Sequence, residues 1–193
     1  MTSTKPSDQM NQLGIVQAGA PILTVPARRF DLPSECTAAE ETTARLLEVL
    51  RRLTEVHEFA KGRGLAAPQI GIDRAAAVVQ PPDPEAEVVV LLNPRIIEAS
   101  EERDEQYEGC LSFFDVRGMV PRPLSITVEA VALDGTVSTM TYETGLARLV
   151  HHEIDHLDGL LYTARMRPGL KPIPVEEYRQ TGSRWNYPDA ARG

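Results

Sequence analysis

The pentapeptide HEIDH at residues 152–156 constrains the chain most, because its two histidines act together only on a helix. The four-residue spacing puts the imidazoles of His152 and His156 on one helix face, about one turn apart, where one metal ion can bind both. Glu153 projects beside them. Apolar residues recur at helical spacing over about residues 146–157, and Gly159 follows as a C-terminal stop signal. The pattern therefore predicts a helix that can carry a metal.

A cysteine offers a third ligand. The chain has 2 cysteines, Cys36 and Cys110, which can form one disulfide bond at most. In the reducing compartment that we expect, free thiols or a thiolate ligand are more common than disulfides. Cys110 stands isolated in the run EGCLS at residues 108–112, and thiolate is a good ligand for a borderline or soft divalent ion. Cys36 lies near a helix start and is expected to be inert.

The hydrophobic pattern predicts a helix, then strands, then the histidine-bearing helix. Thr37 and Glu40 form a capping box, and apolar residues at three- and four-residue steps predict a long amphipathic helix over roughly residues 38–61. Asp134-Gly135 marks a hairpin turn. Segments rich in β-branched residues predict strands at 75–79, 88–92, 125–133 and 137–142. We expect an α+β fold of mostly antiparallel strands around the central metal-binding helix, with a long N-terminal helix.

Length and composition exclude several classes of protein. The 193 residues are enough for one domain with a sizeable core, and 42% hydrophobic with 25% charged residues is the composition of a globular protein. No apolar run approaches the roughly 18 residues of a membrane-spanning helix. A net charge of −8 disfavours bulk binding to nucleic acid or anionic lipid. The start lacks the pattern of a signal peptide, so we expect a cytoplasmic protein with no membrane partner.

Three motifs together carry a family resemblance. The run GRGLAAPQ at residues 62–69 lacks the Gly-Lys-Ser/Thr of a phosphate-binding loop, and its small residues favour the close approach of a peptide backbone. With EGCLS and HEIDH it resembles the signature motifs of the peptide deformylases, G-x-G-L-A-A-P-Q, E-G-C-L-S and H-E-x-D-H. Each motif matches at every fixed position, in the order of the family. The resemblance implies a metal-dependent hydrolase that removes N-formyl groups.

The resemblance also suggests a division of the chain into three parts. Residues 1–20 show no hydrophobic period and are expected to form a flexible N-terminal arm. Residues 21–166 contain all three motifs and make up the deformylase-like catalytic domain. Residues 167–193 carry several prolines and Trp185, and are expected to be a weakly structured C-terminal extension.

By similarity, one divalent metal binds to Cys110, His152 and His156, with water in the open fourth position. Fe²⁺ is the typical metal of the family, and Zn²⁺, Ni²⁺ and Co²⁺ also suit a Cys/His/His site. Glu153 is then the base that takes a proton from the attacking water and delivers it to the leaving amine. The side-chain amide of Gln69 and the backbone N–H of Leu111 face the oxyanion.

The residues around these sites are expected to have structural roles, and the resemblance suggests a partner for one of them. Glu108 is expected to pair with Arg122 and steady the cysteine loop. Asp155 is expected to be a supporting or surface charge. His151 lies about 100° around the helix from the ligand face and is expected not to bind metal. His57 is interpreted as an ordinary histidine on a helix face.

Residues expected to bind substrate include departures from the family. Arg63 stands where deformylases usually have an apolar residue, Gly145 where they usually have Leu, and Phe113-Phe114 where an apolar residue and Pro are typical. These changes predict a wider, more polar pocket that accepts a larger or acidic first side chain. The expected substrate-binding residues are Gly62, Arg63, Gly64, Gly109, Gly145 and Arg148.

The expected substrate is an N-formylated peptide, including nascent chains at the ribosome, so that the chain would act in N-terminal processing during protein biosynthesis. Two alternatives remain open. One is an amidase or metallopeptidase that acts on another N-acyl compound, although the Cys110 ligand and the Gln69 motif argue against an ordinary metallopeptidase. The other is a catalytically silent paralogue that binds peptides, although no ligand or base has been lost.

Overall fold

Small antiparallel sheets form the framework of the molecule, whose computed structural model describes residues 5–185 and residue 187. Each sheet has three strands, with the orders β1-β2-β3, β4-β7-β8 and β5-β6-β9, and every strand pairing is antiparallel. The predicted α+β class with antiparallel strands is confirmed. The strands span Arg63–Ala66 (β1), Ala76–Gln80 (β2), Val89–Leu92 (β3), Arg95–Ala99 (β4), Arg103–Cys110 (β5), Phe113–Pro123 (β6), Ser125–Val131 (β7), Val137–Glu143 (β8) and Ile173–Pro174 (β9).

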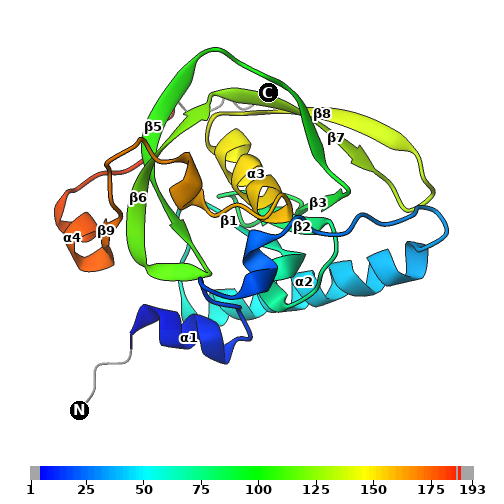
Figure 1. Ribbon diagram of the computed structural model, residues 1–193, viewed down its shortest axis with the longest axis horizontal. Coiled ribbons are helices and arrows are strands. Elements are labelled where there is room, and N and C mark those ends of the chain that lie inside the picture. Colours follow the sequence, from blue (N-terminus) through cyan, green and yellow to red (C-terminus); the bar gives the residue numbers. More distant parts are fainter. Residues whose placement is uncertain (1–4, 186, 188–193) are drawn as a thin grey trace.

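Helix α3 lies among the sheets, in contact with β1 and β2 on one side and with β7 and β8 on another (Figure 1). Its apolar residues, among them Val150 and Ile154, pack into one buried cluster with Val79 and Ile126 of the strands. The helices span Pro6–Gln12 (α1), Cys36–Val56 (α2), Thr144–Leu157 (α3) and Val175–Gln180 (α4), with short 3-10 turns at Pro21–Thr24, Ala67–Ile70 and Tyr162–Arg165.

The predicted stop of the histidine-bearing helix has a steric cause. Helix α3 ends at Leu157, and Gly159 follows with a φ of +75°. A Cβ at this position would lie 2.7 Å from the backbone carbon of Val25, so a side chain would collide with that segment. Glycine alone suits both the backbone angle and the close approach.

Helix α2 covers the sheet β1-β2-β3 with one apolar face (Figure 1). Leu46, Leu50 and Leu53 recur at helical spacing and are at most 3% exposed, and burial of each leucine contributes roughly 1.5–3 kcal/mol. The helix ends at Val56, five residues before the predicted end at residue 61. His57 has extended backbone angles, so it is not the helix-face histidine that the sequence suggested.

The described residues near both ends form more secondary structure than expected. Within the expected arm at residues 1–20, Pro6–Gln12 form α1, and Met10 and Ile15 are buried in the main core. Ser7 also donates backbone and side-chain hydrogen bonds to Asp115. Within the expected extension at residues 167–193, β9 pairs with β6 and α4 follows, with Val175 buried. Residues 1–4, 186 and 188–193 lie outside the described part.

Candidate metal centre

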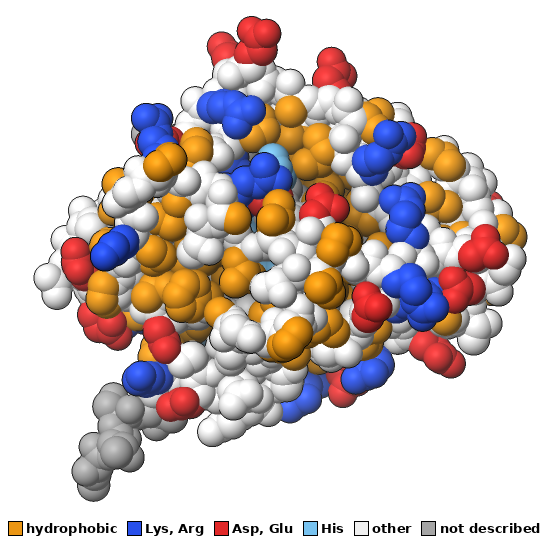
Figure 2. Space-filling model, viewed as in Figure 1, with side chains coloured by type: hydrophobic (Ala, Val, Ile, Leu, Met, Phe, Trp, Pro, Cys, Tyr) orange, Lys and Arg blue, Asp and Glu red, His pale blue; other side chains and the backbone are white. Residues whose placement is uncertain are grey.

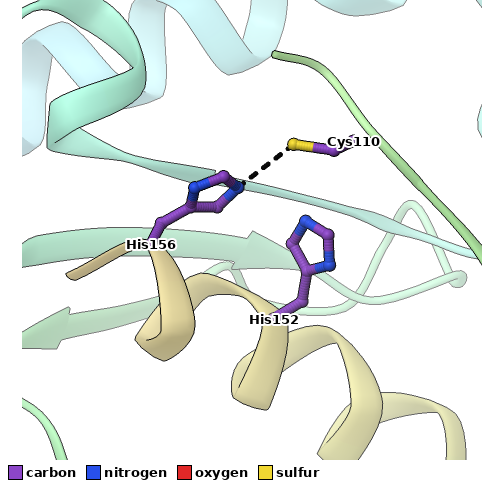
Figure 3. Close-up of side chains that lie close together, drawn as sticks. All are labelled: Cys110, His152 and His156. Atoms are coloured by element: carbon purple, nitrogen blue, oxygen red, sulfur yellow. Dashed lines mark hydrogen bonds between the residues drawn. The ribbon is translucent and has the colours of Figure 1, made fainter. Parts of the chain in front are cut away.

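The side chains of Cys110, His152 and His156 converge on one point (Figure 3). Their ligand atoms all lie within 4.8 Å of one another, and all three residues are buried. The Sγ of Cys110 lies 3.1 Å from Nε2 of His156, and the two imidazole centroids are 5.1 Å apart. A thiolate and two imidazoles in this arrangement suit a tetrahedral or open-site divalent ion.

Different elements bring the three ligands together. Both histidines lie on α3, one turn apart, as the spacing predicted. Cys110 is the last residue of β5, where a register shift after Glu108 bends the strand at its turn into β6. The ring of Tyr162 stacks on the His152 ring at 6.1 Å between centroids and restricts its rotation. The packing therefore aims the donor atoms before any ion is bound.

The carboxylate of Glu108 orients the first histidine. Its Oε2 lies 3.0 Å from Nδ1 of His152, which leaves Nε2 of that ring for a metal. Arg122 donates to both oxygens of Glu108, at 2.8 and 2.9 Å, so the predicted pair is confirmed. Although burial raises the pKa of the Glu108 carboxyl, the charge and hydrogen bonds of Arg122 outweigh it and hold this pKa well below its usual range.

The same network extends along α3. Arg122 also donates to Asp155 at 2.6 Å, and Arg165 donates to the other oxygen of Asp155 at 2.7 Å. Asp155 is thus a buried, paired carboxylate and not a surface charge. The neighbouring His151 lies 3.8 Å from Asp155, directed toward this network and not toward the three ligands.

The surroundings of Cys110 favour its thiolate. Burial alone would raise the pKa of the thiol, but the adjacent His156 and His152 lower it to about 5. Gln69 adds a weak donor, with Nε2 3.6 Å from the sulfur. A thiolate is the form of cysteine that binds metals.

Glu153 follows His152 on α3 and lines a pocket at the candidate metal centre. It is 3% exposed, and its Oε2 has no hydrogen-bond partner among the described residues. Burial raises the pKa of its carboxyl to about 7. The side chain fits only because residue 64 is glycine, since a Cβ there would lie 2.2 Å from Oε1 of Glu153. The glycine of the first motif and the glutamate of the third are thus complementary in space.

Gln69 is fixed through its amide oxygen, which accepts a hydrogen bond of 2.8 Å from the backbone N–H of Ala66. Its Nε2 is directed toward Cys110 and lies 3.2 Å from Oγ of Ser112. Leu111 follows Cys110 and lines the same pocket. The pocket has a cavity volume of about 310 Å³. On the face drawn in Figure 2, charged side chains of both signs are scattered among hydrophobic ones.

The expected substrate-binding residues do not all reach the pocket. Gly62, Gly64 and Gly109 line it, as does Arg63, whose guanidinium lies 5.8 Å from the Phe59 ring. Arg148 borders the pocket, but its guanidinium is buried against Glu108 and Asp104, so it does not point freely at a ligand. Gly145 is not among the described residues that line the pocket. Because glycine has no side chain, Gly145 leaves space outside the pocket.

Sequence reasoning missed several residues that line the pocket. His57 lies there, edge-on to the rings of Phe59 and Phe114. The last segment of the chain contributes Val175, Tyr178, Arg179 and Trp185. The lone tryptophan in a proline-rich tail was the signal available in the sequence, because a large aromatic side chain is rarely left without a packing partner.

Comparison with known proteins decides the family. The family model described as polypeptide deformylase matches residues 13–171. The chain belongs to the polypeptide deformylase family. It is therefore a hydrolase of the peptide deformylase class, and the match includes all three motifs. Peptide deformylase from Roseiflexus castenholzii is 38% identical over 168 residues, which cover 79% of this chain and 91% of that protein. The one from Thermomicrobium roseum is 42% identical over 139 residues, covering 67% and 78%.

Solved deformylases share the fold. The Met-Ala-Ser-bound class I type b peptide deformylase from Acinetobacter baumannii aligns with a TM-score of 0.68 and 30% identity, over 86% of this chain and 100% of that one. Peptide deformylase 1B from Arabidopsis thaliana, in complex with an inhibitor, aligns with a TM-score of 0.69 and 29% identity, over 86% of each chain. In the described part of this deformylase, no helix has the length and apolar character needed to cross a membrane.

Proposed function

We propose that this deformylase removes the formyl group from the N-terminal formyl-methionine residue of peptides, and so releases formate and a free amino terminus. The observation that carries the proposal is the position of Glu153, which lies without a hydrogen-bond partner among the described residues, next to a buried Cys/His/His set and inside an open pocket. A base, a metal-binding set and a peptide-sized pocket are the parts that amide hydrolysis requires.

Cys110, His152 and His156 would hold one divalent ion, with Fe²⁺ proposed and Zn²⁺, Ni²⁺ or Co²⁺ also compatible. The fit rests on the donor set, on the low pKa of the Cys110 thiol and on the Glu108 contact that leaves Nε2 of His152 free. When bound, such an ion acts as a Lewis acid that lowers the pKa of water and polarises the formyl oxygen.

Glu153 is proposed to move the proton. Its carboxyl has a pKa of about 7, raised by burial, so it can accept a proton from water and donate one to the leaving amine near neutral pH. Gly64 lets this carboxylate lie against the backbone of β1. Because neighbouring glycines also let an extended peptide approach, the formyl group would be delivered next to the base.

Gln69 and Leu111 are proposed to stabilise the oxyanion. The bond from Ala66 to Oε1 of Gln69 fixes the amide so that its N–H₂ end is directed into the site. Each preorganised donor of this kind contributes roughly 3–4 kcal/mol to the transition state in other hydrolases. The backbone N–H of Leu111 would be the second donor.

The proposed setting is the cytoplasm, with nascent chains at the ribosome among the substrates. The direct test of the reaction is formate release from formyl-Met-Ala-Ser, with acetyl-Met-Ala-Ser as the matched substrate. Formate from the first and no acetate from the second supports the proposal. Acetate at an equal rate would indicate a general N-acyl amidase, and no product from either would contradict the proposal.

A further inference from the structure

The wall of the active-site pocket includes a segment that the family match does not reach. The polypeptide deformylase model matches residues 13–171, whereas Val175, Tyr178 and Trp185 line the pocket together with the catalytic motifs. We call the described residues from 175 to 187 the C-terminal wall. This wall is a feature of this chain that the shared motifs do not explain.

Hydrogen bonds and ring contacts hold the wall against β5. Nε1 of Trp185 donates to the backbone oxygen of Tyr107 at 2.9 Å. The rings of Tyr107 and Tyr178 meet edge to face with 5.2 Å between centroids. The indole of Trp185 is partly buried and contributes both apolar contact and one directional hydrogen bond, which together hold the wall against β5.

Lys61 also contacts the wall. Its Nζ donates to the hydroxyl of Tyr178 at 2.9 Å and lies 4.9 Å from the Trp185 ring centroid. Lys61 directly precedes the glycine motif of the pocket. The wall therefore contacts both β5 and the residue that precedes the glycine motif of β1. In this position it narrows the opening of the pocket between these two elements.

Two rings of the wall pack closely against Gly145. A Cβ built at Gly145 would lie 3.3 Å from Cδ2 of Tyr187 and 3.7 Å from Cε3 of Trp185. Alanine would need only a small adjustment, but the larger side chain of leucine would overlap both rings. Gly145 does not line the pocket itself, but it leaves room for Trp185, which does.

A chain of hydrogen bonds connects the wall to the candidate metal centre. The hydroxyl of Tyr187 accepts a bond of 2.8 Å from Nε of Arg148, whose NH1 donates to Glu108 at 2.6 Å. Glu108 in turn contacts His152. The wall is thus fixed to the same framework that orients the ligands.

We propose that Trp185 is a specificity-determining residue, which closes one side of the substrate pocket and limits the size of the first side chain of the substrate. The inference rests on the proposed function for the identity of the substrate, and on the geometry of Gly145 and Trp185 for the wall. It assigns to the C-terminal extension a role in substrate selection.

Trp185 is the single tryptophan of the chain, so its fluorescence reports on the wall and does not depend on catalytic turnover. In the metal-loaded full-length protein, Met-Ala-Ser, the product peptide, should change the emission on titration. Gly145→Leu should shift the emission of the free protein to the red, because the indole becomes solvated, and should weaken the response to the peptide. Gly145→Ala is the matched control and should resemble the wild type. Emission unaffected by both the peptide and Gly145→Leu would overturn the inference.

Steady-state kinetics provide a second test of the inference. Trp185→Ala should lower the ratio of kcat/KM for formyl-Met over formyl-Phe peptides by about tenfold, since pocket contacts of this size discriminate at this level. Gly145→Leu should lower it equally, and the double variant should show no further change, because both act through one wall. An unchanged ratio in a Trp185→Ala protein of normal circular dichroism would overturn the inference. Absence of formate from the wild type would instead reject the proposed function, while the fluorescence arm still tests the wall.

Discussion

Oε2 of Glu108 lies 3.0 Å from Nδ1 of His152, so a buried carboxylate holds the ring that offers its other nitrogen to the candidate metal. A supporting carboxylate fixes the tautomer and direction of a histidine ligand and raises its basicity. Replacing Glu108 with Gln keeps the shape and removes the charge. We expect a loss of metal affinity of roughly 10–100-fold, measured by competition with a chelator. Wild-type affinity would contradict this role.

The buried guanidinium of Arg122 should matter more for stability than an exposed one. Arg122 pairs with Glu108 and Asp155, all at most 2% exposed in their side chains. Arg122→Ala removes one arginine partner from each of two buried carboxylates, which then depend on Arg148 and Arg165 alone, and should cost about 3 kcal/mol in the free energy of unfolding. Arg95→Ala is the control, because it removes an ion pair whose arginine side chain is 62% exposed. It should lower the free energy of unfolding by about 1 kcal/mol or less. Urea denaturation compares the two variants, and equal losses of stability would contradict this role of Arg122.

Metal removal should inactivate and destabilise the protein. Chelation should abolish formate release, and restoring Fe²⁺ without oxygen should recover it. An ion present at about 1,000 times its Kd adds about 4 kcal/mol to the stability of the folded state, so the Tm should rise on reloading. Cys110→Ala should show neither effect, whereas Cys36→Ser, which changes a cysteine outside the site, should show both. A Tm that rises equally in Cys110→Ala would place the metal elsewhere.

Gly64 should tolerate no side chain. A Cβ at this position would lie 2.2 Å from Oε1 of Glu153, so Gly64→Ala must displace the proposed base. A misplacement of about 1 Å costs on the order of 10²-fold in rate, and we expect a loss of kcat of this size with bound metal retained. Metal analysis and steady-state formate release measure both quantities. Full kcat in Gly64→Ala would show that Glu153 is not held as described.

Arg63 should set the charge preference of the pocket. Its Nε is buried without a hydrogen-bond partner among the described residues, and its guanidinium lies near Phe59. Formyl-Glu peptides would give this cation a partner. Arg63→Leu should shift the ratio of kcat/KM toward formyl-Met over formyl-Glu by about tenfold or more. Arg51→Leu, on the exposed face of α2, should leave the ratio unchanged. Equal ratios in wild type and Arg63→Leu would remove the hypothesis of an acidic first side chain.

The parts of the structure that follow from local pattern were predictable from the sequence. The spacing of His152 and His156 gives a helix face, and Asp134-Gly135 joins β7 to β8 as expected. Strand β5 was missed because its residues, Arg103–Cys110, are mostly polar, and its stability comes from pairing with β6 and not from its own alternation. Tertiary pairing of this kind leaves no local pattern.

In the site, too, the residues in local motifs were predictable from the sequence, whereas contacts between distant segments were not. The motifs identify Cys110 and Gln69 as candidates, but not the docking of Trp185 in the wall of the same pocket. That contact depends on the space at Gly145 and on the backbone oxygen of Tyr107, which lie far apart in the sequence. Likewise, Arg148 was expected to face the substrate, whereas its buried bonds to Glu108 show a supporting position. Glycines and arginines acquire such roles only from the fold around them.

Glu153 is proposed to act as the base beside the Cys/His/His set. The most direct measurement is formate release from formyl-Met-Ala-Ser by wild type and Glu153→Gln, both prepared without oxygen and with Fe²⁺ content determined. We expect equal metal content in both proteins and a turnover that is lower in the variant by a factor on the order of 10²–10⁴. Wild-type turnover in a metal-loaded Glu153→Gln protein would contradict this role.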